Sequence, residues 1–106
     1  MNNLPIVDAE ISIEPIGTSD TSMAKEITAA YDAIRKIPNL KVTLTPMSTQ
    51  VESENIDDIL QAIRVAHDSA KSAGVKRVIS TIRIDERLDK PNTLEEKVQS
   101  VKSKAS

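Results

Sequence analysis

The sequence predicts an α+β sandwich in which an antiparallel sheet carries helices on one of its faces. Apolar and polar residues alternate from Val7 to Glu14 and again in three shorter segments, which is the period of strands with one buried face. Two segments between these strands carry apolar residues at spacings of three and four, which is typical of amphipathic helices. All 106 residues are expected to form one domain, with an ordered core from about residue 5 to 101.

The first half of the chain predicts a strand, a helix and a strand. We expect Pro15 to end the ladder of the first strand, and Gly17 to permit a turn. Ser22 or a neighbour should cap the first helix, which Pro38 ends. The buried stripe of this helix is predicted to be Met23, Ile27, Ala30, Tyr31, Ile34 and Ile37. Residues 41–45 alternate again and predict the second strand.

The second half repeats this order. Residues 49–52 predict a short third strand after a corner at 46–48, and Asn55 should cap the second helix. Its stripe is predicted to be Ile56, Ile59, Leu60, Ile63, Ala66, His67 and Ala70, with Gly74 as the C-terminal stop. Residues 78–84 form the fourth predicted strand. Thr93 and Glu96 have the spacing of a capping box, which predicts a short C-terminal helix.

This order, βαββαβ followed by a helix, predicts a ferredoxin-like sandwich. The alternation assigns each strand residue to a face. The helix-facing set is predicted to be Val7, Ala9, Ile11, Ile13, Val42, Leu44, Val51, Val78, Ile82 and Ile84. The opposite, open face should carry Glu10, Ser12, Thr43, Thr45, Gln50, Glu52, Ile79, Thr81 and Arg83.

Composition narrows the classes of function. The chain has no cysteine, and basic and acidic residues are interspersed at a formal net charge of −2. We therefore expect no thiolate site, no metal, no cofactor, no nucleic-acid partner and no membrane segment, and we expect a cytoplasmic protein. Tyr31 is the only aromatic residue. Because aromatic rings normally supply much of the buried area of a core, self-association is expected to compensate.

Two groups of residues are candidates for binding. Glu10, Ser12, Glu14, Thr81 and Arg83 should meet on the open face, where they could bind an aminopyrimidine-like heterocycle or an anion; a solvated or subunit-facing surface is an equally good interpretation. The corner at 46–52 places a methionine beside hydroxyls and a carboxylate, and it is either a pocket or simply a hairpin corner.

Other polar groups favour structural roles. The charged segment 85–90 mixes acidic and basic residues, which favours ion pairing or a subunit contact over a cation site. His67 lies on the predicted apolar stripe of a helix and has no second histidine or cysteine to join it in a metal site, so we interpret it as a core residue. Nothing in the sequence forms a nucleophile-and-base set, and we expect no enzyme activity.

With these motifs in view, the chain resembles the small thiamine-binding-protein family from about residue 7 to 101. The matching segments are residues 15–18 with Ser22, residues 46–52, and residues 78–90 leading into 94–98. The resemblance implies a homotetramer made from dimers that binds thiamine or its hydroxymethylpyrimidine moiety without catalysis. It points to Gly17, Thr18, Ser22, Met47, Thr49 and Glu52 as motif matches.

The residues and the resemblance together predict a ligand-binding set. It consists of Glu10, Ser12, Thr18, Ser22, Met47, Ser48, Thr49, Glu52, Thr81 and Arg83. The alternative hypothesis is a regulatory or structural ferredoxin-like oligomer that senses another small metabolite through the same surfaces.

Overall fold

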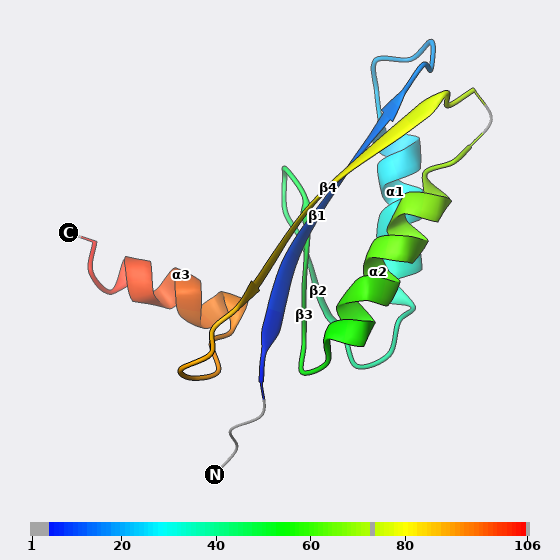
Figure 1. Cartoon of the computed structure of the whole chain (residues 1–106). Coiled ribbons are helices and arrows are strands. Elements are labelled where there is room, and N and C mark those ends of the chain that lie inside the picture. Colours follow the sequence, from blue (N-terminus) through cyan, green and yellow to red (C-terminus); the bar gives the residue numbers. More distant parts are fainter. Residues whose placement is uncertain (1–4, 73, 106) are drawn as a thin grey trace.

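The computed structural model describes residues 5–72 and 74–105, and its architecture is the predicted ferredoxin-like α+β sandwich. Strands β1 (Val7–Ile16), β2 (Lys41–Leu44), β3 (Thr49–Ser53) and β4 (Arg77–Glu86) form one antiparallel sheet in the order β2-β3-β1-β4. Helices α1 (Ala24–Arg35) and α2 (Ile56–Ser69) pack on one face of the sheet (Figure 1), which we call the helix face.

The core lies between the helix face and these two helices. In β1 the apolar residues of the alternation are buried, and Val51 of β3 joins them at 0% exposure. Small residues on α2 let that helix approach the sheet closely. The buried apolar set is Val7, Ala9, Ile11, Ile13, Ala30, Ile34, Ile37, Val51, Ile59, Ala62, Ala66 and Ala70. No aromatic side chain belongs to it, so the core of the described sandwich is packed from aliphatic side chains alone.

The helix ends differ in part from their predictions. The side chain of Asn55 caps α2 as predicted, accepting a hydrogen bond from the Asp57 amide at 2.9 Å. The prediction for Gly74 is wrong, because α2 already ends at Ser69, while Gly74 has a φ of 91° in the following turn. At the start of α1, Met23 is the N-cap, and the Ser22 hydroxyl accepts from the Ala24 amide at 3.2 Å.

The structure also corrects several packing predictions. Pro15 does not end the ladder: β1 continues to Ile16, and Pro15 lies opposite Val78 of β4. A proline fits there because β3 pairs with β1 only as far as Ile11, so at Pro15 the strand has a partner on one side alone and is locally an edge. Five residues predicted to be buried are exposed, because the contact between helices and sheet is narrower than the predicted apolar stripes and leaves two edge-strand positions uncovered. They are Met23, Leu44, Ile56, Leu60 and Ile84, at 39%, 54%, 44%, 49% and 43% exposure.

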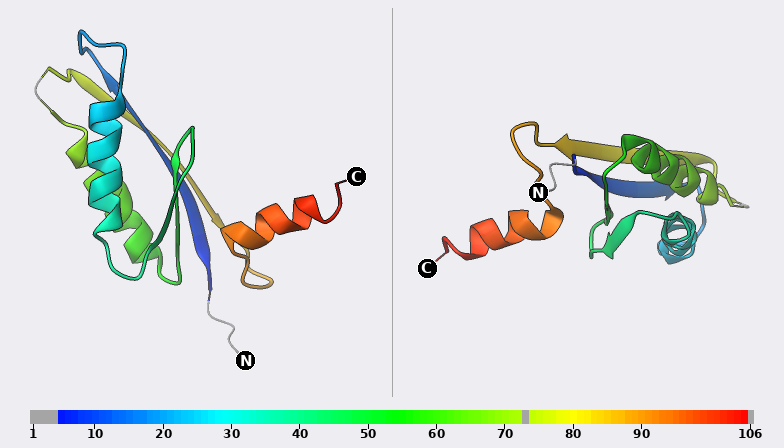
Figure 2. Two further views of the ribbon diagram at one scale, coloured as in Figure 1. Left: turned by 180° about the vertical axis from the view of Figure 1, so that it is seen from behind. Right: turned by 90° about the horizontal axis from the view of Figure 1, so that it is seen from below.

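A third helix, α3 (Leu94–Lys102), lies on the opposite side of the sheet from α1 and α2 and projects away from it (Figures 1 and 2). Its start has the predicted capping box, in which the Thr93 hydroxyl accepts from the Glu96 amide and the Glu96 carboxylate accepts from the Thr93 amide. No residue of α3 is buried. We call the sheet face on this side the open face.

Candidate functional site

Cross-strand register brings the open-face residues together in rows. Glu10 of β1 lies between Gln50 of β3 and Arg83 of β4, and Ser12 lies opposite Thr81. The predicted pairing of these β1 and β4 residues is therefore confirmed, but its predicted place at the middle of the sheet is wrong, because β4 is an edge strand. A polar, mixed-charge surface of this kind presents several hydrogen-bonding groups within the reach of one small ligand.

Hydrogen bonds fix Glu10 in this surface. Its Oε2 accepts from the Ser48 hydroxyl at 2.8 Å and from the Gln50 amide nitrogen at 3.3 Å. These two bonds, with a smaller contribution from the positive charge of Arg83, lower the pKa of Glu10 below its ordinary value. Glu10 is thus an ionised, oriented acceptor at neutral pH.

A second concave region, the corner cavity, opens where α1, β1 and the β2–β3 turn meet. Its volume is about 300 Å³, and its lining is apolar toward α1 and polar toward the turn. Ser12, Met47, Ser48 and Thr49 of the predicted set line it together. The remaining lining residues are Ile11, Ile13, Glu14, Met23, Ile27, Ala30, Ile34, Leu44, Thr45 and Pro46. This combination of apolar walls and a few polar groups is typical of small-ligand sites.

The turn at the mouth of the corner cavity is held by Thr45. The Thr45 hydroxyl donates to the Ser48 carbonyl at 2.9 Å and accepts from the amides of Met47 and Ser48 at 3.3 and 3.0 Å. Because all three bonds converge on one side chain, the turn is ordered although Met47 is 86% exposed. Thr49 is 6% exposed on the helix face of β3 and so lies at the inner wall of the cavity.

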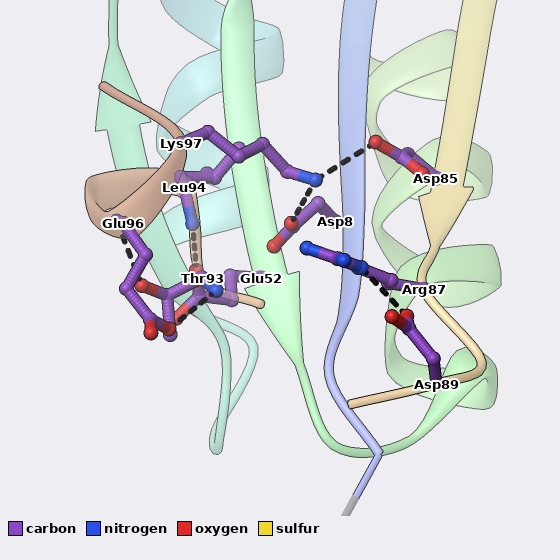
Figure 3. Close-up of polar contacts among 9 residues, drawn as sticks. All are labelled: Asp8, Glu52, Asp85, Arg87, Asp89, Thr93, Leu94, Glu96 and Lys97. Carbon is purple, nitrogen blue, oxygen red and sulfur yellow. Dashed lines mark hydrogen bonds and ion pairs between the residues drawn. The ribbon is translucent and has the colours of Figure 1, made fainter. Parts of the chain in front are cut away.

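The structure separates the other predicted residues from this cavity. Thr18 and Ser22 lie in the β1–α1 loop, where the Thr18 hydroxyl donates to the Asp20 carbonyl at 3.0 Å. Glu52 lies on the open face, where its Oε1 accepts from the Leu94 amide at 2.8 Å and so holds the start of α3 (Figure 3). The predicted set therefore divides among the corner cavity, the open face and a loop.

Sequence reasoning missed Asp8 and Lys97. Asp8 lies on the open face directly opposite both Glu52 and Asp85 yet is only 2% exposed, and the Lys97 ammonium of α3 is 3.3 Å from its Oδ2. Asp8, Asp85 and Lys97 line an open-face cavity of about 450 Å³. Glu10, Gln50 and Arg83 are among its other lining residues. The alternation of β1 does place Asp8 beside Glu10, but only the register reveals the neighbouring carboxylates.

The ion pairing predicted for the charged segment is confirmed, whereas His67, predicted to be a core residue, is only half-buried and lies outside the buried apolar set. In the charged segment 85–90, Arg87 pairs with Asp89 at 2.6 Å, while Asp85 pairs with Lys97 of α3 at 2.8 Å. The ring of His67 is half-buried, and its Nδ1 lies 2.6 Å from the Ser80 hydroxyl of β4. Within residues 5–72 and 74–105, no group of three or more His, Cys, Asp or Glu side chains could hold a metal ion. Over the same residues, no helix is long and apolar enough to cross a membrane.

Comparisons with known proteins identify the family. The chain belongs to the thiamine-binding protein family, whose model matches residues 9–102. A UPF0045 protein of Methanothermobacter thermautotrophicus is 36% identical over 99 residues, covering 93% of this chain and 99% of its own. The UPF0045 protein YqgV of Bacillus subtilis is 39% identical, covering 88% and 91% respectively. The resemblance predicted from the sequence motifs is thereby confirmed.

Solved structures share the fold. The hypothetical protein MJ1052 of Methanocaldococcus jannaschii superimposes with a TM-score of 0.82 at 37% identity, over 92% of this chain and 96% of its own. A Thermotoga maritima protein whose proposed role is thiamine biosynthesis or salvage has a TM-score of 0.74 at 24% identity, over 92% and 99% of the two chains. At that identity the second likeness shows the fold alone.

Proposed function

We propose that this protein binds thiamine or its hydroxymethylpyrimidine moiety in the corner cavity and performs no catalysis on it. The observation that carries the proposal is that three consecutive residues of a family-like motif, Met47, Ser48 and Thr49, line one cavity with Ser12 of β1. Membership of the thiamine-binding protein family supports the ligand class.

The chemistry of the cavity fits an aminopyrimidine. Its apolar wall can contact the faces of a planar ring, and Met47 at the mouth is a soft, adaptable side chain that can lie over that ring. The hydroxyls of Ser12 and Thr49 can each donate to a ring nitrogen or accept from an amine, and the Glu14 carboxylate can accept from an exocyclic amine. The Ser48 hydroxyl donates to the Glu10 carboxylate, but the pKa of Glu10 is lowered and makes it a weak base, so binding is the chemistry that these groups support.

Calorimetric titration tests the ligand and its place together. Wild-type protein should bind thiamine or hydroxymethylpyrimidine, and Thr49→Val, which keeps the shape of the side chain but removes its hydroxyl, should bind about threefold to tenfold more weakly. Thr43→Val is the matched control, because Thr43 is exposed on β2 and lines neither cavity.

Glu52→Gln separates the two candidate surfaces. It removes a carboxylate from the open face and should leave pyrimidine affinity unchanged if the ligand lies in the corner cavity. The opposite pattern, weakened binding in Glu52→Gln and normal binding in Thr49→Val, would place the ligand on the open face and overturn the assignment. Binding of another metabolite class with no response to any pyrimidine would favour the sensing hypothesis instead.

We further propose that the protein acts in the cytoplasm as a one-domain chain that assembles into a homotetramer. The free edge of β4 supports self-association, because ten residues pair on one side with β1 while β4 ends the sheet on the other. Long, uncovered edges of this kind favour pairing with another chain. The other edge strand, β2, has only four residues.

The residues of β4 suit antiparallel pairing with a second copy. With the two-fold axis at Thr81, Val78 lies opposite Ile84 of the second chain and Arg77 lies opposite its Asp85. Val78 would meet the apolar Ile84, and opposite charges would meet at Arg77 and Asp85. These contacts favour this register, although Ile79 would lie opposite Arg83. The exposed Ile84 would then be covered. Stacking two such dimers through their open faces would complete a closed tetramer.

A further inference from the structure

Three carboxylates form a row across the open face where α3 begins. Glu52 of β3, Asp8 of β1 and Asp85 of β4 are direct cross-strand neighbours. Like charges in such positions repel one another, so this carboxylate row needs compensation. Figure 3 shows that the compensation comes from α3, which reaches the row through its first turn.

The contacts of α3 with the row are polar. Lys97 Nζ lies 2.8 Å from Asp85 Oδ2 and 3.3 Å from Asp8 Oδ2, and the Leu94 amide donates to Glu52. Lys41 of β2, next to Glu52 in the sheet, lies 4.0 Å from Glu95 of α3. Because no residue of α3 is buried, these interactions, more than apolar packing, hold the helix in place.

Compensation at Asp8 is incomplete. The residue is 2% exposed, and neither of its carboxylate oxygens has a hydrogen-bond partner among the described residues, although Oδ2 has the ion pair with Lys97. Burial raises the pKa of Asp8 to about 6, since the stabilising effect of Lys97 is smaller and the negative charge of Glu52 adds to the rise. The next row along the sheet, with Glu10 and Arg83, contributes one charge of each sign.

We propose that α3 is a lid on the open face, and that a proton taken up by the carboxylate row closes this lid while loss of the proton loosens it. Opening α3 would let water reach Asp8, and hydration favours the ionised carboxylate. The closed form therefore binds the proton more tightly than the open form. By linkage, closure is favoured below the pKa of the closed form and weakens as the pH rises through it.

The size of the effect has an upper bound. If opening returned the pKa of Asp8 from about 6 to its ordinary value of 3.8, the ratio of closed to open forms would fall by about a hundredfold between acid and neutral pH. Glu52 and Asp85 remain neighbours of Asp8 in the open form, so the pKa of Asp8 there stays above 3.8 and the change in the ratio is smaller than this figure. This inference rests on neither the proposed ligand nor the proposed tetramer.

Spin-label distances can measure the lid directly, because the chain has no cysteine of its own. One label goes on Ser103→Cys at the end of α3 and the other on Gln61→Cys, an exposed position on α2 behind the sheet. Labelled chains are diluted with unlabelled chains so that each oligomer holds at most one. Double electron–electron resonance should give a narrow distance distribution at about pH 4.5 and a broader one at about pH 8, with a midpoint near the pKa of Asp8.

Two variants make the measurement specific. Asp8→Asn imitates the protonated carboxyl and should give the narrow distribution at both pH values, whereas Lys102→Met removes a charge from the last turn of α3 and should respond as the wild type does. An unchanged wild-type distribution would overturn the proposal. So would an undiminished response in Asp8→Asn, which would assign the transition to another titratable group.

A carbon-13 titration of the wild-type carboxyl groups keeps the test decisive if Asp8→Asn folds poorly. The Asp8 resonance should move with the same midpoint as the distance distribution. Clearly separate midpoints would also overturn the proposal. Far-UV circular dichroism at both pH values checks that the sandwich stays folded.

Discussion

Two carboxylates on the open face of β1 show how strongly neighbours control a side chain. Glu10 and Asp8 are two residues apart on the same face, yet the pKa of Glu10 is lowered and that of Asp8 is raised. Glu10 accepts two hydrogen bonds at the edge of a cavity, whereas Asp8 is buried beside other carboxylates. Composition and alternation predict the same environment for both residues. The opposite shifts of their pKa values therefore follow from strand register and burial.

The two glycines of the chain provide a prediction at single positions. Both have positive φ, 97° at Gly17 and 91° at Gly74. A Cβ at Gly17 would lie 2.7 Å from the Cβ of Lys76, whereas a Cβ at Gly74 would meet nothing within 4 Å. Gly74→Ala should therefore cost only backbone strain, about 1 kcal/mol, and Gly17→Ala about 2–4 kcal/mol because overlap is added to the strain.

Urea unfolding of both variants measures this difference, with Gly74→Ala as the matched control. The two substitutions add the same methyl group at nearly the same φ, so a larger loss in Gly17→Ala isolates the contact with Lys76. Equal losses of unfolding free energy would show that Lys76 moves aside freely.

At the scale of elements, local signals predicted which segments form helices and strands. The alternation in β1, the cap at Asn55 and the capping box at Thr93 are each encoded within a few residues. The errors arise where tertiary coverage decides. Leu60 belongs to the apolar stripe of α2 by spacing but remains 49% exposed, because the sheet contacts a narrower strip of that helix.

Removing two equivalent caps should have unequal consequences. Asn55→Ala and Thr93→Ala each remove a side-chain acceptor at a helix N-terminus, worth about 1 kcal/mol to the helix. Because α2 buries Ile59, Ala62 and Ala66 in the core, Asn55→Ala should lower the midpoint of thermal unfolding by several degrees. Because α3 buries nothing, Thr93→Ala should leave that midpoint nearly unchanged.

Hydrogen exchange should detect the destabilisation of α3 in Thr93→Ala that the thermal midpoint does not report. Amides of α3 should exchange faster in Thr93→Ala, while those of the core strands keep their protection. A fall in the unfolding midpoint as large as that of Asn55→Ala would mean that α3 folds and unfolds together with the sandwich.

At the scale of the whole molecule, the sequence predicted the two faces of the sheet but not what covers them. Alternation assigned Glu10, Thr81 and Arg83 to the open face, and the β1–β4 register brings these residues side by side. That α3 lies over the end of this face depends on Lys97 meeting Asp8 and Asp85, residues far apart in sequence. Long-range charge pairing of this kind leaves no periodic signal, so sequence patterns could not reveal it.

The proposed assembly leads to a prediction for the whole molecule. Light scattering at micromolar concentration should report near four times the chain mass of 11.6 kDa. Ile84 and Leu44 are 43% and 54% exposed on the helix face, one on each edge strand of the sheet. An aspartate at either position is compatible with the folded single chain, but Ile84→Asp would place a charge in the proposed β4–β4 contact, where it has no partner. Ile84→Asp should therefore lower the mass toward that of the chain, whereas Leu44→Asp should keep the tetramer.

A wild-type protein that stays folded at 11.6 kDa would contradict the proposed tetramer itself. Equal masses for the two variants would show that the contact between subunits does not lie at the edge of β4.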